Sequence, residues 1–193
     1  MKRFALFLSG TGGNALNLLR ACREGRVQGL PVVGLASSAK AGGIARLEAE
    51  GLPMVAVVRK DFDSDEAYSE ACYQAAEEAG AEFICLCGWL KKLTVPLRWE
   101  GRIVNIHPGL LPRFGGPGMY GMHVHRAVLE SGEAESGATV HLVDAEYDHG
   151  RILDQLRVPV LLGDTPEELQ KRVYAAEMEL FPRALAAYLR ERA

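Results

Sequence analysis

Short apolar runs separated by segments with helical spacing make up the first half of the chain. Four runs lack a charged residue and have the length of buried strands: Phe4–Leu8, Pro31–Ala36, Val55–Val58 and Phe83–Cys87. Between them, apolar residues recur every three or four positions over Ala15–Glu24, Gly42–Glu50 and Ser64–Ala79. Unbroken apolar strands that alternate with helices predict a parallel sheet covered by helices on both faces.

The second half departs from this alternation. Ile103–Ile106 is a short strand, and Gly109–Gly121 is too rich in glycine and proline to form a helix. A helix is expected around Val124–Leu129. Thr139–Val143 and Ile152–Val160 are strands joined by an acidic turn, which predicts a hairpin.

The last helix carries clear start signals. Thr165 suits the N-cap, Pro166 the first helical position, and Glu168 follows three residues after the cap. Its apolar face is formed by Leu169, Val173, Ala176, Leu180 and Ala184. The pattern as a whole predicts one α/β domain, with a Rossmann-like, mostly parallel sheet and an antiparallel part near the C-terminus.

Composition and charge narrow the class of protein. The chain has 193 residues, 48% of them hydrophobic and 24% charged, which is typical of a globular domain. A net charge of −3 gives no reason to expect nucleic acid as a partner, because proteins that bind it usually carry a basic stripe, and no apolar run is long enough to span a membrane. The short apolar run near the N-terminus leads into a glycine turn, so we expect a first strand rather than a signal peptide. Four cysteines without metal spacing predict a reduced, cytoplasmic protein.

A glycine-rich loop, SGTGGN at 9–14, follows the first strand and opens the first helix. Such a loop binds phosphate because its N–H groups can approach an anion at the helix N-terminus. A dinucleotide site would also need an acid at the end of the second strand, and the sequence there, from Ala36 to Lys40, has none. Ser38 and Lys40 leave an NADP-binding site open, and a turn without ligand is the third interpretation.

Asn105 and His107 stand out in NIHPGLLP, residues 105–112. Two positions apart on a strand, their side chains point to the same face. Converging donors at the end of a strand would suit the oxyanion of an acyl transfer. The alternative is that Asn105 merely caps its own turn, and the spacing does not decide between the two.

The remaining histidines and acids give weaker signals. His123 and His125 are two apart on a helix and face different ways, so we predict no metal site and an exposed helix surface for both. His141 lies in a strand, where a structural role and a site role are equally compatible with the pattern. The acidic stretch DAEYDHG, 144–150, is either an ordinary turn or the source of a carboxylate for His107.

Taken together, these motifs resemble the phosphoribosylglycinamide formyltransferase family, folate-dependent enzymes of purine synthesis. SGTGGN resembles the phosphate loop of the family, and NIHPGLLP its active-site signature, with Gly109 in place of serine. ATVHLVDAEYDHG resembles the folate loop, and VYAAEMELFP the closing helix. The resemblance covers about Arg3 to Pro182. It implies a single formyltransferase domain over 1–193, with 1–100 as the phosphate-binding half and 101–193 as the catalytic and folate-binding half.

The resemblance also implies roles for individual residues. His107 would be the general acid, Asn105 an oxyanion donor, and Asp148 the group that keeps His107 protonated and helps to move the proton of the amine. The carboxylate is expected to raise the pKa of His107. The remaining assignments divide by ligand. Gly12, Gly13 and Asn14 would hold the phosphate of glycinamide ribonucleotide, Glu177 its amine, and Leu90, Lys91, Lys92, Leu93, Asp144, Ala145, Glu146, Tyr147 and Asp148 the folate.

The implied co-substrate is 10-formyltetrahydrofolate, with no metal, no nucleic acid and no membrane as partner, and the chain would be a monomer or a homodimer. Three positions depart from the pattern of the family. Asp65 stands where arginine is frequent, so a contact with the folate is expected to be lost unless Arg59 or Lys60 replaces it. Arg151 replaces a proline, and Pro117 a lysine.

Other functions remain open from the sequence. Methionyl-tRNA formyltransferase and formyltetrahydrofolate hydrolase share the N-I-H-P chemistry but add further domains, for which 193 residues are expected to leave no room. An NADP-dependent reductase would use the glycine loop with Ser38 and Lys40. A non-catalytic nucleotide-binding module would use the loop alone.

Overall fold

Seven strands form one sheet in the computed structural model, which describes residues 1–192. In chain order they are β1 (Lys2–Leu8), β2 (Gly29–Ala36), β3 (Met54–Ala56), β4 (Phe83–Leu86), β5 (Ile103–His107), β6 (Glu135–Leu142) and β7 (Ile152–Pro159). Their spatial order is β3-β2-β1-β4-β5-β6-β7. The pairs from β3 to β5 are parallel, whereas β6 runs antiparallel to β5 and β7 antiparallel to β6. The predicted mostly parallel sheet with an antiparallel C-terminal part is confirmed.

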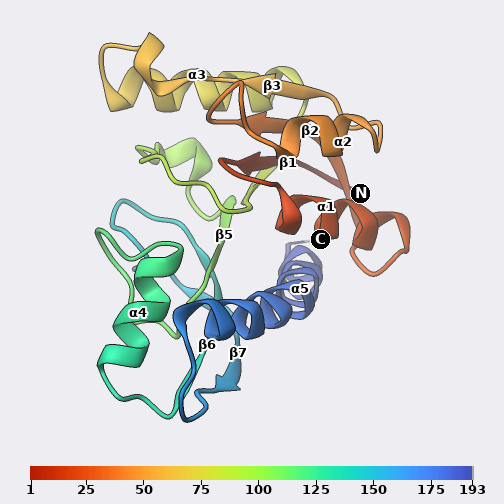
Figure 1. The fold of residues 1–193 in the computed structure, drawn as a ribbon. Helices are drawn as coiled ribbons and strands as arrows, with labels where there is room; N and C mark the ends of the chain where they lie inside the picture. Colours follow the sequence, from red (N-terminus) through yellow and green to blue (C-terminus); the bar gives the residue numbers. More distant parts are fainter. Residues whose placement is uncertain (193) are drawn as a thin grey trace.

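Helices cover both faces of this sheet (Figure 1). They are α1 (Gly13–Arg23), α2 (Gly43–Glu48), α3 (Asp65–Glu78), α4 (Met122–Glu130) and α5 (Pro166–Glu191), with short 3-10 turns at Arg59–Asp61 and Leu97–Trp99. Strand β1 shows why both faces must be covered, since Phe4 and Leu6 pack into the core under α1 and α5 while Ala5 and Phe7 pack into the core under α3. A strand without a polar face can only be buried between two layers.

Some element ends differ from the sequence prediction. Strand β6 begins at Glu135, four residues earlier than expected, and its first residues pair with the end of β7. Gly137 lies there against the backbone of Leu156, so closely that a Cβ would collide with its carbonyl oxygen. The pattern missed this part because its residues are small and polar. Strand β5 extends through His107, which pairs with Thr139.

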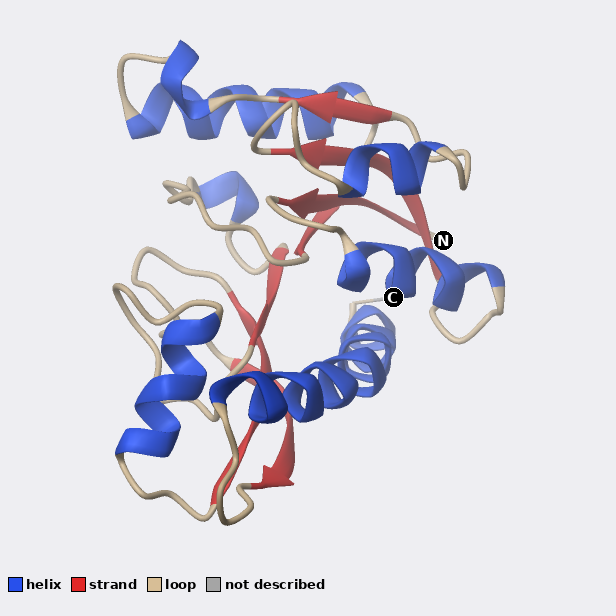
Figure 2. Cartoon of the chain, in the orientation of Figure 1, coloured by secondary structure: helices blue, strands red, loops and turns tan. Residues whose placement is uncertain are grey.

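The chain changes direction at the centre of the sheet. Strand β1 is followed by β2 and β3 on one side, and β4 then returns to the other side of β1. In open α/β sheets, the crevice at the carboxyl ends of strands beside such a reversal is the usual ligand site. Figure 2 shows loops gathered on the side of the sheet to which the arrowheads of the parallel strands point. Among residues 1–192, every helix is too short or too polar to cross a bilayer.

Candidate active site

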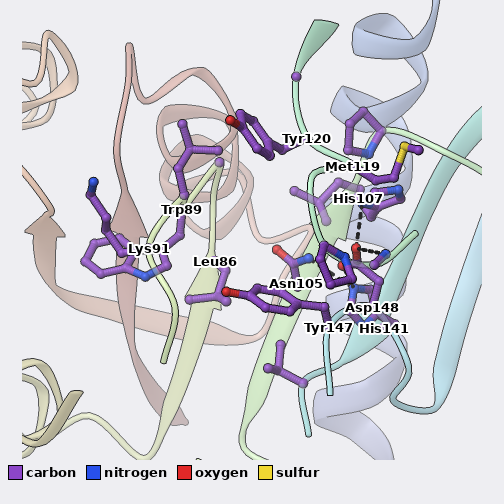
Figure 3. A pocket seen from close by; sticks show the side chains of 18 of the residues that line it. Leu86, Trp89, Lys91, Asn105, His107, Met119, Tyr120, His141, Tyr147 and Asp148 are labelled. Carbon is purple, nitrogen blue, oxygen red and sulfur yellow. Dashed lines mark hydrogen bonds and ion pairs between the residues drawn. The ribbon is translucent and has the colours of Figure 1, made fainter. Parts of the chain in front are cut away.

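A cavity of about 420 Å³ opens at the carboxyl ends of β4 and β5. Its walls come from the segment after β4, from the glycine-rich loop 109–121, from the acidic loop after β6, and from one face of α5 (Figure 3). Elements far apart in the sequence therefore supply one concave site, as expected for a small-molecule pocket.

Asn105 and His107 both line this cavity from β5. Antiparallel pairing places Asn105 opposite His141 and His107 opposite Thr139. Asn105 does not cap its own turn, because its Nδ2 lies 3.0 Å from Nε2 of His141 on the neighbouring strand. His141 therefore has a place in the site. Its Nδ1 lies 2.8 Å from the carbonyl oxygen of Leu142, which accepts from Nδ1–H and leaves Nε2 to accept from Asn105.

Asp148 joins the two histidines. Its Oδ2 lies 3.6 Å from Nδ1 of His107, and its Oδ1 lies 3.6 Å from Nε2 of His141. The N–H of Gly116 donates to Asp148 Oδ2 at 3.0 Å. The acidic turn thus brings a carboxylate to His107, which the sequence spacing alone could not show. Asp148 has φ 54°, a left-handed conformation that is rare outside glycine and frequent at functional sites.

Burial as well as charge shifts the pKa values of His107 and Asp148. Burial lowers the pKa of His107 and outweighs the opposing effects of Asp148 and of the hydrogen bond to Phe114. Asp148 acts on His107 in the predicted direction, but the predicted net rise in the pKa of His107 is wrong, because the residue is only 3% exposed and burial disfavours its charged form. For Asp148, burial raises the pKa, but the proximity of His141, the charge of His107 and the N–H of Gly116 bring it below its ordinary value.

A second polar pair lies across the cavity. Asn14, in the first turn of α1, donates from Nδ2 to Glu177 Oε2 of α5 at 2.8 Å. Glu177 is 8% exposed, and burial raises its pKa to about 7, although the bond from Asn14 acts in the opposite direction. Both residues line the cavity, and Asn14 Oδ1 has no partner among the described residues. This end of the cavity can accept hydrogen bonds from an amine.

The glycine loop stands at the start of α1, as predicted. Gly12 is the N-cap with φ 70°, and a Cβ there would come within 3.0 Å of the Cα of Gly43. Gly12 and Gly13 lie just outside the cavity lining. Tyr174 of α5 covers Gly13 so closely that a Cβ on Gly13 would collide with its hydroxyl oxygen. Arg46 of α2 donates to the carbonyl oxygen of Thr11 at 2.7 Å, so a guanidinium lies beside the loop.

The residues assigned to the folate all line this cavity: Leu90, Lys91, Lys92, Leu93, Asp144, Ala145, Glu146, Tyr147 and Asp148. The replacement at Asp65 has a structural consequence, because Arg59 Nε pairs with Asp65 Oδ1 at 2.6 Å and its Nη1 bonds the carbonyl oxygen of Phe62. Arg59 is therefore engaged. Arg151 pairs with Glu191, and Pro117 lines the cavity.

Sequence reasoning missed two cavity residues on α5 and wrongly predicted the exposure of one on α4. Tyr174 and Gln170 line the cavity from α5, one and two turns before Glu177, a helical spacing that could have identified them. His125 is buried, not exposed as predicted, and burial lowers its pKa to about 4. It lines the cavity beside His107 because α4 turns this side of the helix inward, while His123 is exposed as expected.

Within residues 1–192, no three His, Cys, Asp or Glu side chains are arranged to hold a metal ion. The NADP alternative loses support from the position of its two candidate residues. Ser38 and Lys40 lie outside the cavity lining, and the backbone N–H of Lys40 donates to the hydroxyl of Ser38 itself. Gly43 closes against Gly12, between the glycine loop and the end of β2, where a dinucleotide would need room.

The sequence of the chain is similar to sequences of known formyl transferases. The sequence profile described as formyl transferase matches residues 2–185. A protein from Arabidopsis thaliana named "Phosphoribosylglycinamide formyltransferase, chloroplastic" is 41% identical over 194 residues, which is 99% of this chain and 66% of that protein. A "Trifunctional purine biosynthetic protein adenosine-3" from Drosophila pseudoobscura pseudoobscura is 43% identical over 96% of the chain. The chain spans 14% of the length of the Drosophila relative and just under two thirds of the plant relative.

Solved structures agree with the sequence matches. A glycinamide ribonucleotide transformylase from Symbiobacterium toebii superposes with a TM-score of 0.93 at 34% identity, over 100% of this chain and 89% of that one. A phosphoribosylglycinamide formyltransferase from Brucella melitensis gives a TM-score of 0.88 at 41% identity, over 97% and 95% of the two chains.

Proposed function

Because the chain belongs to the formyl transferase family, and to the phosphoribosylglycinamide formyltransferases within it, we propose that it transfers the formyl group of 10-formyltetrahydrofolate to the amine of 5-phosphoribosylglycinamide. The observation that carries this proposal is the meeting of two polar groups in one cavity. Asn105, His107 and Asp148 form one group, and the Asn14–Glu177 pair forms the other. The first suits a reacting formyl carbon, and the second an incoming amine.

The proposed reaction needs no nucleophilic side chain. The neutral amine attacks the formyl carbon directly, and the carbonyl oxygen becomes an oxyanion in the tetrahedral intermediate. Asn105 has two N–H donors, of which His141 takes one, so the other can reach the oxyanion. Protonated His107 supplies the second donor and then protonates the leaving nitrogen of the folate. Asp148 stabilises the imidazolium and accepts the proton that the amine loses.

Binding of the ribonucleotide is assigned to the N-terminus of α1 and to α5. The N–H groups of Gly12, Gly13 and Asn14 would hold the phosphate, helped by the dipole of the eleven-residue helix. Glu177 would accept from the glycine amine while Asn14 keeps its carboxylate in place.

Binding of the folate is assigned to the segment after β4 and to the acidic loop after β6, both of which line the cavity. Leu90 and Leu93 would pack beside the pteridine, and Asp144–Asp148 would close over it. Lys91 and Lys92 are exposed cations there, suited to the carboxylates of a folate tail. We further expect small-molecule partners only, a monomer or a homodimer, and a cytoplasmic location in keeping with the free thiols.

One assay tests the proposal against its competitors. The protein is incubated with 10-formyltetrahydrofolate, with and without glycinamide ribonucleotide, and deformylation of the folate is followed by absorbance. We expect turnover only when the ribonucleotide is present. Turnover that ignores the ribonucleotide would indicate a hydrolase. Binding of NADPH without formyl transfer would indicate a reductase and would overturn the proposal.

A further inference from the structure

Among residues 1–192, two residues other than glycine have a left-handed backbone, and both contact His107. Phe114 has φ 56° and Asp148 has φ 54°. For a residue with a Cβ this conformation costs on the order of 1–2 kcal/mol. Such residues persist where the surrounding contacts hold them, and they concentrate at functional sites. None of the roles proposed above explains why Phe114 has this conformation.

The reason lies in the backbone of the glycine-rich loop. The carbonyl oxygen of Phe114 lies 2.7 Å from Nε2 of His107. Two residues later, the N–H of Gly116 donates to Oδ2 of Asp148 at 3.0 Å. The turn 114–116 thus contacts both members of the His107–Asp148 pair, each through a main-chain group. At the same time the ring of Phe114 packs against the apolar core.

A carbonyl oxygen can only accept a hydrogen bond, so Nε2 of His107 must carry a proton. In the neutral imidazole the lone pair is then on Nδ1, the atom 3.6 Å from Asp148. When His107 takes up a second proton, this proton goes to Nδ1, beside the carboxylate and inside the cavity. The Phe114 carbonyl therefore decides which ring nitrogen exchanges its proton.

Gly115 allows the turn to come this close. A Cβ at this position would lie 2.5 Å from Cδ2 of Leu111 and 3.0 Å from Cβ of Asp148. Both neighbours are packed, since Leu111 is 5% exposed and Asp148 is held by Gly116. A side chain at position 115 would push the turn away from the carboxylate.

We propose that the turn Phe114–Gly115–Gly116 is a positioning device that fixes the tautomer and the ring orientation of His107 and the direction of the Asp148 carboxylate through main-chain hydrogen bonds. The importance of this device for catalysis rests on the proposed function. The positioning itself is a property of the unliganded protein and can be measured without substrate.

The first test uses the unmodified protein. Nitrogen-15 NMR of the imidazoles over a pH titration reports which nitrogen of neutral His107 is protonated, with His107→Gln used to assign the signals. We expect a proton on Nε2 and titration at Nδ1. Neutral His107 with its proton on Nδ1 would overturn the proposal, whatever reaction the protein catalyses.

The second test compares two variants that both lose the ring. Asn tolerates the left-handed conformation, whereas the β-branched Val does not. Phe114→Asn should keep the Nε2–H tautomer, and Phe114→Val should give a mixture of tautomers. With glycinamide ribonucleotide and formyl folate, Phe114→Val should lose kcat by about a hundredfold while both KM values change by less than about threefold, because the reacting groups are misplaced but the binding groups are not.

The third test covers the case in which Phe114→Val does not fold. Gly115→Ala should shift the kcat–pH profile and lower kcat, while Gly42→Ala, at a glycine with open space around it, should do neither. The groups around His107 that could also titrate are Asp148, His141 on β6 and His125 on α4, and the NMR titration follows the histidines separately. The proposal would be overturned if Phe114→Asn, Phe114→Val and Gly115→Ala all showed the same His107 tautomer and the same kcat–pH profile. Failure of the unmodified protein to transfer formyl would instead overturn the proposed function.

Discussion

Glu177 is a carboxylate in the interior of the protein, and this position has a cost as well as a use. It is 8% exposed, burial raises its pKa to about 7, and Asn14 donates a hydrogen bond to it. A buried carboxylate that ionises near neutral pH can accept a hydrogen bond from a bound amine. An exposed glutamate would bind the amine only in competition with water. The same burial makes the ionised form a source of instability in the unliganded protein.

We therefore predict that Glu177→Gln stabilises the protein at high pH. Because the folded-state pKa is raised, the stability linked to this group is present below the unfolded pKa and is lost as pH rises through about 7. The free energy of unfolding in urea should be higher in Glu177→Gln than in the unmodified protein at pH 8, by up to about 3 kcal/mol, and the gap should narrow toward pH 5. A gap that does not change with pH would contradict this account.

The same variant should weaken substrate binding. As pH falls through about 7, protonation of Glu177 should raise the KM for glycinamide ribonucleotide in the unmodified protein. In Glu177→Gln the KM should be high throughout, without this pH dependence. The KM for the folate serves as the control, because Glu177 is assigned to the amine of the ribonucleotide and not to the folate.

We predict that His107→Ala and Asp148→Ala each lose most of the formyl-transfer activity while the fold persists. Removing one preorganised donor to an oxyanion typically costs about 10²–10³ in kcat. Asp148 contacts His107 and His141, so its loss also leaves the imidazolium without its carboxylate. His123→Ala is the matched control, since His123 is exposed and outside the cavity lining. Near-normal kcat in either active-site variant, with an unchanged circular dichroism spectrum, would refute the assigned roles.

At the scale of elements, α5 is the element that joins the core to the site. Its apolar face is buried as predicted, from Leu169 through Ala184, and it packs against α1, α4 and the last two strands. Tyr174 and Glu177 face the cavity from the same helix. Its N-terminus is fixed by the capping box that the sequence predicted, in which Thr165 Oγ1 accepts from the N–H of Glu168 and Glu168 Oε2 accepts from the N–H of Thr165.

The cap should therefore contribute to stability and not to chemistry. Thr165→Ala is expected to lower the free energy of unfolding by about 1 kcal/mol, measured by urea denaturation. Thr165→Ser keeps the hydroxyl and should lose much less. Glu177 lies three turns further along the helix, so kcat should stay within about twofold in both variants. A large loss of kcat in Thr165→Ala would mean that the start of α5 moves with the site.

At the scale of the whole molecule, the sequence predicted the layers of the fold better than the contacts of the site. Uninterrupted apolar strands such as Phe4–Leu8 can only be buried on both faces, so their pattern determines the sheet. Asn105 and His107 could be paired from a spacing of two. The approach of Asp148 to His107 depends on how the loop after β6 folds back, and burial reversed the expected pKa shift of His107. Neither effect has a local pattern in the sequence.

Ligands that bind in the cavity should also raise the melting temperature of the protein. A ligand that binds only the folded state at about 100 times its Kd adds about 2.7 kcal/mol, which for a chain of this size raises Tm by about 5–10 °C. We expect such a shift from glycinamide ribonucleotide in thermal unfolding monitored by fluorescence, and none from NADPH, because Ser38 and Lys40 lie outside the cavity lining. Glu177→Gln should reduce the shift from the ribonucleotide but not the shift from 10-formyltetrahydrofolate. An NADPH shift as large as that from the ribonucleotide would show that the glycine loop binds a dinucleotide after all.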